Sequence, residues 1–398
     1  MNYNSLCLLI LDMKKIAIIG GGISGITSAI KFAQNKHNRI DIFEKRSFIL
    51  KGPPYCHLHA GGILYPEILL EDAQILLRDS IQFANRFNTC LNYRPVIVAY
   101  HTASKYSTES LVFKCKVNKL DYEFSPIHPL GKVENFYAVY QLSDIIHYKK
   151  YGKLPESNDV GRAFHDPYVE QFCKLLDDIY SIKYPFVSVN EPGIDKDKVE
   201  EQLIRELSTY KNINIVTNKE IQLDELSSYN IIVNASGKNI FTFNENKIQE
   251  IYEFKSSWII KTHVKIQNIP EIAIIGERGT KNGMIQITPI SNGTFQVHCM
   301  RDDSTIINTF NNFEDIYISD QDIEKRGNIA IREISKLFSV FILGKVDGAC
   351  PGLQRIPYDT KSKRTSGIKT YKIDDKIYID IQTVKACSII SVINEMFV

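Results

Sequence analysis

Three glycines near the start of the chain have the spacing of a phosphate-binding turn. Gly20, Gly22 and Gly25 fit the pattern G-x-G-x-x-G, which joins a strand to a helix in dinucleotide-binding units. The first glycine permits a tight turn, the second lets the backbone approach a pyrophosphate, and the third lets helix and strand pack closely. The helix N-terminus adds N–H donors and partial positive charge. The pattern therefore predicts a dinucleotide site, and Ser24 within the turn belongs to it.

Glu44 supplies the second chemical feature of this site. It follows Gly25 by about 20 residues, the spacing at which a carboxylate accepts hydrogen bonds from a ribose hydroxyl. Its negative charge disfavours a 2′-phosphate, and the adjacent Lys45 belongs to the same predicted cofactor-binding set. Both FAD and NAD bind to such units, so the motif alone does not choose between them.

A βαβ unit positions these residues. Ile16–Ile19 is a continuous apolar run, typical of a strand buried on both faces, and a helical pattern extends from the glycines to Ala33. Arg39–Phe43 predicts a second strand that ends directly before Glu44. Met13 is a candidate start of the protein, because the twelve residues before it lack the features of a secretory signal.

The rest of the chain predicts further helices and strands. We expect a helix between Glu67 and Phe87, short strands between Val96 and Leu120, and a partly helical insertion from Gln141 to Tyr180. Alternating segments between residues 251 and 310 predict an antiparallel sheet, with Ser291–Gly293 as one of its turns. Other predicted elements are the helix Lys196–Leu207, the strands Ile213–Val216 and Ile231–Val233, and a final strand and helix at Lys376–Asp380 and Ala386–Phe397.

Length and composition are those of a globular protein with more than one core. The chain has 398 residues, of which 44% are hydrophobic and 24% charged, and its formal net charge is +2. A chain of this length usually folds as two domains. No run of like charge suggests a nucleic-acid partner, and no apolar run is long enough to span a bilayer. The eight cysteines show no metal-like spacing, so we expect reduced thiols, no metal and a cytoplasmic location.

Several segments carry a resemblance to a known superfamily. They are Lys15–Gly25 with Phe43–Lys45, His59–Pro66, Ile231–Gly237 and Gly352–Asp359. In content and order these segments resemble the D-amino-acid oxidase superfamily of FAD-dependent oxidoreductases, which includes glycine oxidase, L-2-hydroxyglutarate dehydrogenase and, more distantly, malate:quinone oxidoreductase. The resemblance covers nearly the whole chain and favours FAD over NAD. It implies an α/β fold with a Rossmann-type, glutathione-reductase-like FAD-binding domain and a second, mixed antiparallel-sheet domain for the substrate.

The resemblance also implies a discontinuous division of the chain into these two domains. We expect the FAD-binding domain to consist of residues 13–90, 185–245 and 345–398. The substrate domain would then consist of residues 91–184 and 246–344.

Further cofactor contacts follow from the resemblance. In this superfamily the segment after the second strand passes beside the flavin ring, which implies that the backbone at Gly61 and Gly62 meets the isoalloxazine. The turn with Ala235 and Gly237 is similar to the second FAD-contacting loop. Lys385, just before the final helix, would place positive charge near the pyrimidine side of the ring. The glycine-rich turn that many relatives have at that point is absent here.

The resemblance also implies candidate catalytic residues. By position, Arg355 corresponds to the arginine that pairs with a substrate carboxylate, and a guanidinium suits a carboxylate in two-point contact. Arg301 is a second candidate anchor. For a 2-hydroxy acid a base must take the hydroxyl proton, and histidine is the usual choice. His59 is the first candidate for this base and His57 the second.

The resulting expectation is an FAD-dependent oxidoreductase that transfers a hydride from a small carboxylate substrate, preferably a 2-hydroxy acid, to flavin. The electron acceptor would be oxygen, a quinone or a carrier protein, and a peripheral contact with the inner face of the membrane stays open. Three alternatives remain: an amino-acid or amine oxidase of the same fold, a non-catalytic flavin or nucleotide sensor, and, disfavoured, an NAD-dependent dehydrogenase.

Overall fold

The computed structural model describes eleven stretches of the chain. They are residues 14–50, 56–222, 224–237, 251–263, 268–277, 280–291, 293–301, 307–310, 319–356, 366–382 and 385–397. Met13 and residues 357–359 of the predicted arginine segment lie outside these stretches. For Arg355 the backbone is described and the side chain is not.

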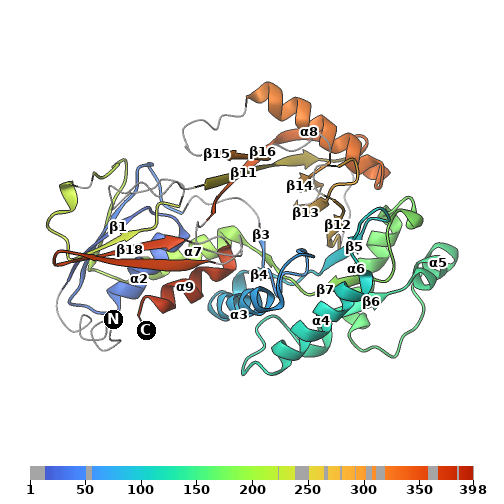
Figure 1. Ribbon diagram of the computed structural model, residues 1–398, viewed down its shortest axis with the longest axis horizontal. Helices are drawn as coiled ribbons and strands as arrows, with labels where there is room; N and C mark the ends of the chain where they lie inside the picture. Colours follow the sequence, from blue (N-terminus) through green and yellow to red (C-terminus); the bar gives the residue numbers. More distant parts are fainter. Residues whose placement is uncertain are drawn as a thin grey trace.

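A six-stranded sheet contains the N-terminal βαβ unit. Five of its strands run parallel, and β17 at the edge runs antiparallel to β18. Figure 1 shows this sheet, with helices α2 and α9, at one end of the molecule. In order across the sheet the strands are β17 (Gly367–Ile373), β18 (Lys376–Gln382), β10 (Ile231–Asn234), β1 (Lys15–Ile19), β2 (Arg39–Phe43) and β9 (Ile213–Val216).

Strand β1 is buried on both faces, as its unbroken apolar sequence predicts. Ile16 and Ile18 point into the larger core of this half, and Ala17 and Ile19 belong to a smaller cluster on the opposite face. The larger core also takes in apolar side chains from four helices. These helices are α2 (Ile23–Ala33), α3 (Leu70–Arg86), α7 (Lys196–Leu207) and α9 (Ile389–Glu395).

A nine-stranded, mostly antiparallel sheet forms the other half of the protein. Its one parallel pair joins β12 to β5. The strands in order are β15 (Ile307–Phe310), β11 (Ile251–Lys261), β14 (Thr294–Cys299), β13 (Ile285–Ser291), β12 (Glu271–Ile275), β5 (Val96–Tyr100), β7 (Phe186–Val189) and β6 (Tyr137–Tyr140), and β16 (Lys345–Ile356) also pairs with β11.

Helices cover both faces of this sheet. On one face α5 (Leu142–Tyr151), α6 (Arg162–Leu175) and α8 (Asp320–Ser335) enclose a core with Trp258 and Phe172. On the other face α4 (Thr108–Glu123) packs its buried Leu111 and Cys115 against β5 and β7. Short 3-10 turns are η1 (Asn88–Cys90), η2 (Val133–Asn135), η3 (Ile179–Ser181), η4 (Asp224–Leu226), η7 (Ser339–Phe341) and η8 (Ala386–Ser388).

A small third sheet has three short strands and lies between the two large sheets (Figure 1). Strand β8 (Gly193–Ile194) pairs antiparallel with both β3 (Cys56–His57) and β4 (Leu91–Asn92). His57 stands opposite Gly193, and the Leu58 N–H donates to the Pro192 carbonyl. This pairing brings the histidine segment beside the residues that follow β7.

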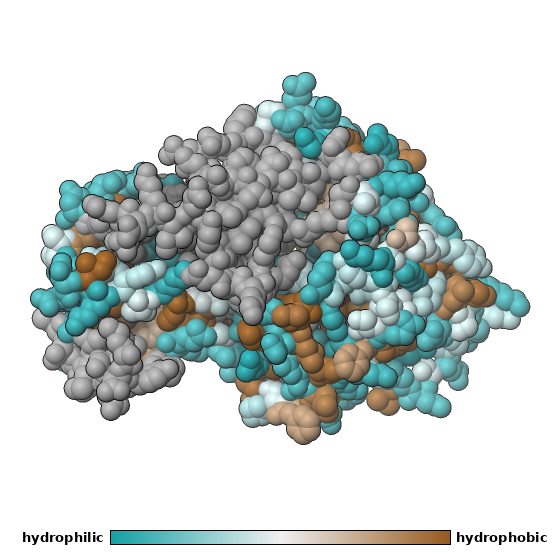
Figure 2. Space-filling view, in the orientation of Figure 1, coloured by the Kyte–Doolittle hydropathy of each residue, from teal (hydrophilic) through white to brown (hydrophobic). Residues whose placement is uncertain are grey.

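Most predicted elements are confirmed, and one is wrong. Helix α4 occupies much of the stretch from Val96 to Leu120 that we expected to hold short strands. Ser107 caps this helix by accepting a hydrogen bond from the Ser110 N–H, and its buried residues recur at helical spacing. Its outer face carries exposed Phe113, and Figure 2 shows apolar side chains gathered over α3 and α4. Apolar residues on both faces conceal the helical pattern.

Sheet membership bears on the proposed domain boundaries. Strands β7 and β16 lie in the stretches 185–245 and 345–398 that we assigned to FAD binding, yet both pair within the nine-stranded sheet. We therefore propose that these two strands be grouped with the substrate domain. None of the helices in the described part of the chain combines the length and apolar character needed to cross a membrane.

Candidate functional site

The three motif glycines occupy three different environments in the turn between β1 and α2. Gly20 has φ +104°, and a Cβ there would lie 2.6 Å from the Ala235 carbonyl oxygen. A Cβ at Gly25 would lie 1.9 Å from the Gly20 carbonyl oxygen. At Gly22, by contrast, no described neighbour lies within 4 Å of a Cβ. The first and third glycines are therefore required by packing, and the second borders open space.

Glu44 is fixed beside this turn by backbone donors. Its Oε2 accepts from the Gly21 N–H at 2.8 Å and its Oε1 from the Arg46 N–H at 3.0 Å. A carboxylate has about four acceptor positions, so these two bonds leave room for hydroxyl donors. Ser24 is buried in the first turn of α2, and Lys45 is exposed.

The second predicted loop adjoins the first. Strand β10 ends at Asn234, and the Ala235 N–H donates to the Ile19 carbonyl at 2.9 Å. Gly237 has φ +66°, a left-handed conformation that favours glycine. The structure thus brings Gly20, Ala235 and Gly237 to the same carboxyl edge of the parallel sheet, where ligands of such folds bind.

His59 and Lys385, far apart in the sequence, meet through Tyr65. His59 is buried, and its Nε2 lies 3.5 Å from the Tyr65 hydroxyl oxygen. Lys385 donates from Nζ to the same oxygen at 2.9 Å. The structure therefore joins the predicted base to the predicted C-terminal cation.

Gly61 and Gly62 form the turn that follows His59. Their φ values are +96° and +61°, and the Gly61 N–H donates to the His59 carbonyl at 2.7 Å. Asn118 of α4 donates to the Gly61 carbonyl at 3.2 Å, and a Cβ at Gly61 would collide with that amide. The turn therefore needs glycine for the space that Asn118 occupies as well as for its backbone conformation.

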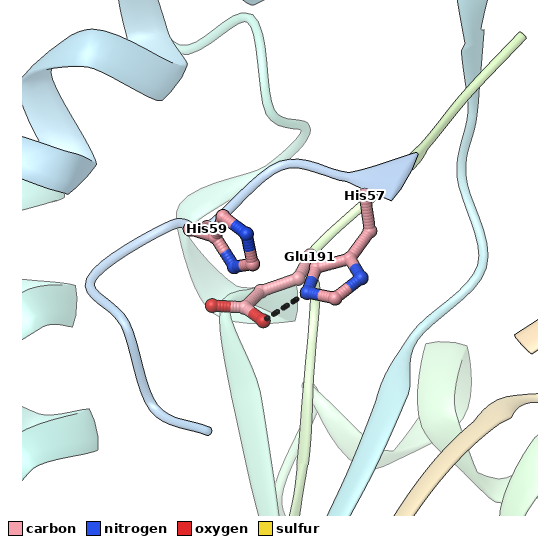
Figure 3. Close-up of side chains that lie close together, drawn as sticks. All are labelled: His57, His59 and Glu191. Atoms are coloured by element: carbon pink, nitrogen blue, oxygen red, sulfur yellow. Dashed lines mark ion pairs between the residues drawn. The ribbon is translucent and has the colours of Figure 1, made fainter. Parts of the chain in front are cut away.

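His57 lies between two buried carboxylates that the sequence analysis missed. Its Nδ1 is 2.9 Å from Glu271 Oε1, and its Nε2 is 3.7 Å from Glu191 Oε2. Figure 3 shows His57, His59 and Glu191 grouped together, with the dashed line marking the His57–Glu191 ion pair. Glu271 is held further by Arg94 at 2.8 Å and by Gln286 at 2.6 Å.

The two carboxylates differ in charge state. Burial raises the pKa of Glu191 to about 7, with a further rise from Glu271, against the lowering influence of His57, the Ile63 N–H and Lys385. Burial also raises the pKa of Glu271, but His57, Arg94 and the hydrogen bonds outweigh it and hold that pKa well below its usual range. Glu271 is therefore the ionised partner of His57, and Glu191 is the carboxylate that gains or loses a proton near neutral pH.

The two candidate arginines for the substrate carboxylate are described to different extents. Arg355 lies in β16, where its backbone pairs with Tyr252 of β11, and its side chain lies outside the described atoms. Arg301 is buried and donates from Nε to the Gly283 carbonyl at 3.0 Å. Its guanidinium thus has a structural bond, and the assignment of either arginine to a substrate carboxylate stays a prediction.

Little in the sequence identifies the missed residues. Glu191 follows the apolar strand β7, and Glu271 opens the apolar strand β12. A charged residue at the end of a buried strand is a weak local signal. It says nothing about His57, which reaches them only through the pairing of β3 with β8.

Comparison with solved structures shows the fold. L-Proline dehydrogenase from P. horikoshii is 13% identical over 97% of this chain and 92% of that chain, with a TM-score of 0.61. Glycine oxidase from Geobacillus kaustophilus is 12% identical over 96% and 94%, with a TM-score of 0.56. Dithionite-reduced L-α-glycerophosphate oxidase from Mycoplasma pneumoniae, a structure with FAD bound, is 11% identical over 97% and 94%, with a TM-score of 0.61.

By sequence the chain matches no family model and no curated protein. The likeness therefore lies in the fold, which is the one shared by these dehydrogenases and oxidases. It confirms the predicted fold class, a Rossmann-type domain joined to a second, mixed-sheet domain. Glycine oxidase, a member of the superfamily that the sequence resembles, is among the matching structures.

Proposed function

We propose that this protein is an FAD-dependent oxidoreductase that oxidises a small carboxylate substrate. The observation that carries the proposal is the geometry of the Gly20–Gly25 turn, which adjoins the Ala235–Gly237 loop at the carboxyl edge of a parallel sheet. The likeness of the whole chain to oxidases and dehydrogenases, one of them with FAD bound, supports the choice of FAD.

The turn fits the pyrophosphate of a dinucleotide. Helix α2 begins after Gly22, and among the described residues no side chain caps its N-terminus. The first turn of the helix borders the open space at Gly22. The helix dipole, an N-terminus without a side-chain cap among the described residues, and the open space together suit an anion. Glu44 has acceptor positions left for the ribose hydroxyls of the same ligand.

The substrate side of the proposal uses the histidine segment. When bound, FAD accepts the hydride from the substrate carbon, so the protein has to orient the substrate and take its proton. His59, with Lys385 and Tyr65 on one side and Glu191 on the other, is our candidate for the group that takes the proton of a 2-hydroxy acid. Arg355 and Arg301 are the proposed partners of the carboxylate.

An amino acid is the second candidate substrate. Two of the structures with this fold are named for proline and glycine, which supports an amino-acid oxidase as well as a hydroxy-acid enzyme. A non-catalytic flavin sensor would keep the same dinucleotide turn without turnover. The candidate electron acceptors are oxygen, a quinone and a carrier protein, and kinetic measurements with each of them would identify the one used.

The cofactor is tested by a pair of glycine substitutions. Gly22→Ala has room for its methyl group and a φ of −75°, so the variant should fold as the wild type does. The methyl group would stand where the pyrophosphate approaches, so bound FAD should fall at least tenfold. Gly367→Ala, also without a described neighbour within 4 Å of its Cβ, is the matched control and should keep its FAD. Flavin absorbance per chain after gel filtration measures the effect.

The substrate class is tested by anaerobic flavin reduction. The flavin band is recorded before and after addition of 2-hydroxyglutarate, malate, lactate, glycine, sarcosine and D-amino acids, one at a time. We expect a hydroxy acid to bleach the band, and the His59→Ala variant to keep its flavin without being bleached. Bleaching only by amino acids would select the second candidate, and a yellow protein that nothing reduces would favour the sensor.

A further inference from the structure

His57 and Glu191 face each other at a distance longer than a normal hydrogen bond. Glu271 is ionised and accepts from Nδ1 of His57, so in the neutral ring the lone pair lies on Nε2. That nitrogen is 3.7 Å from Glu191 Oε2. A hydrogen bond between nitrogen and oxygen spans about 2.7–3.2 Å. The contact is therefore longer than a normal hydrogen bond and leaves space between the two groups.

Glu191 is the more unusual of the two groups. Its side chain is completely buried, and among the described residues no hydrogen bond of normal geometry reaches its oxygens; the Ile63 N–H and His57 Nε2 make weaker contacts with it. An unpaired buried carboxylate is costly, and proteins keep one where a cation or a metal binds it. Arg94 does not serve this purpose, because it pairs with Glu271.

His59 completes a three-residue group. One nitrogen of His59, one of His57 and one carboxylate oxygen of Glu191 all lie within 4.8 Å of one another. In Figure 3 the three side chains point toward one another from the β3 segment and from the residues after β7. We propose that His57, His59 and Glu191 bind one divalent transition-metal cation of the Zn²⁺ class.

The distances favour a metal ion of this size. Bonds of about 2.0–2.1 Å in tetrahedral geometry separate neighbouring ligand atoms by about 3.4 Å. The 3.7 Å between His57 and Glu191 is close to that value, and the remaining separations of up to 4.8 Å need side-chain rotation. Two histidines and one glutamate form a common ligand set of zinc sites that keep a fourth position open.

The residues around the group have the arrangement of an outer shell. A histidine that binds a metal usually donates its other N–H to a carboxylate, which fixes the ring and strengthens the ligand. Glu271 accepts this bond from His57 and is itself held by Arg94 and Gln286. His57 Nε2 is thus oriented toward Glu191 by Glu271, which is itself held by buried Arg94 and half-buried Gln286.

A bound cation would change one part of the proposed function. His59 would then be a ligand, and the open coordination position would hold water or the hydroxyl oxygen of a hydroxy acid. Only this refinement rests on the proposed function; metal binding itself does not require flavin. The inference also replaces the expectation of no metal, which rested on cysteine spacing and could not consider histidines brought together by folding.

The test is Zn²⁺ titration of chelator-stripped protein by calorimetry, with metal content measured after gel filtration. We expect one Zn²⁺ per chain. The variants His57→Ala, His59→Ala and Glu191→Ala should each weaken binding at least 100-fold, and Glu271→Gln should weaken it about 10- to 100-fold through the outer shell. His37→Ala, an exposed histidine outside the group, is the matched control and should bind as the wild type does.

Two results would overturn the proposal. One is a wild-type protein that binds no stoichiometric Zn²⁺, which does not depend on the folding of any variant. The other is stoichiometric binding that survives all three ligand substitutions. Titration of the Gly22→Ala variant separates this question from the cofactor: Zn²⁺ bound without flavin would support the metal site even if the flavin proposal failed.

Discussion

Two buried histidine sites in this protein differ in how their polar atoms are satisfied. His165 in the nine-stranded half has a partner at each ring nitrogen: Ser188 Oγ at 2.8 Å from Nδ1 and the Asn135 carbonyl at 3.0 Å from Nε2. His57, in contrast, faces Glu191, whose oxygens have no partner of normal geometry among the described residues. Both ring nitrogens of His165 therefore have a hydrogen-bond partner, whereas the site at His57 has room for a further ligand beside Glu191.

The two sites also differ in the pKa values of their buried groups. Burial lowers the pKa of His165 to about 4, although its bond to Asn135 opposes the shift, so the ring is neutral at pH 7. The group around Glu191 instead has a carboxyl pKa of about 7. Perturbed groups of this second kind concentrate at functional sites, because a completed network has no capacity left for a ligand.

The largest expected effect comes from removing the cation that supports the incomplete site. Arg94→Met should lower the free energy of unfolding by about 3–5 kcal/mol, because it leaves Glu271 buried with a weaker counterion. Urea unfolding at pH 7 measures the change. Lys105→Met at the exposed Lys105–Glu277 pair is the control and should change it by about 0–1 kcal/mol. A cost for Arg94→Met within the range of this control would contradict the assignment of a buried, essential ion pair.

The complete site predicts acid sensitivity. In the unfolded chain His165 has a pKa of about 6.5, and in the folded protein about 4, so the unfolded state binds the proton first. Stability is fully present above pH 6.5 and is lost as the pH falls toward 4, on the order of 3 kcal/mol in total. Urea unfolding at pH 7, 6 and 5 should show this slope reduced in His165→Gln. Parallel curves for the two proteins would show that His165 does not carry it.

The hydroxyl that completes His165 should have a moderate effect. Ser188→Ala leaves the buried Nδ1 without a donor, which should cost about 1–2 kcal/mol in urea unfolding. Thr209→Ala is the control, because the Thr209 hydroxyl also donates a hydrogen bond, to the Glu206 carbonyl, but is exposed, so its change should stay within about 0.5 kcal/mol. Equal effects at the two positions would mean that burial of the His165 network adds nothing.

The sequence predicts the half with the six-stranded sheet better than the histidine site. The turn at Gly20–Gly25 and the strands beside it depend on local spacing and on unbroken apolar runs, which one sequence displays directly. Helix α4 was missed because Phe113 and Leu120 are exposed while Asn118 is buried, so the apolar period is blurred. Local patterns therefore predict elements only where each face has one kind of residue.

The site around His57 could not be predicted because its parts meet only in the tertiary structure. His57 and His59 were recognised from their own segment, but Glu191 and Glu271 approach His57 through strands paired in two different sheets. The meeting of Lys385 with Tyr65 likewise depends on where the final helix packs. The sequence identifies side chains that are capable of catalysis or binding, and the fold determines which of them are in contact.

The smallest effect on stability is expected at Tyr65, and it separates the two histidine sites most sharply. Tyr65→Phe removes an oxygen that accepts from Lys385 and lies 3.5 Å from His59. Both contacts are only part-buried, so the free energy of unfolding should fall by less than about 1 kcal/mol. Flavin reduction by the substrate should nevertheless slow about tenfold, because Lys385 and His59 lose the group that links them. Ser188→Ala, with its larger cost in stability, should leave the reduction rate unchanged. If Tyr65→Phe instead destabilised the protein as much as Ser188→Ala and reduced flavin at the wild-type rate, the histidine segment would be structural in the same sense as His165, and the contrast between the two sites would disappear.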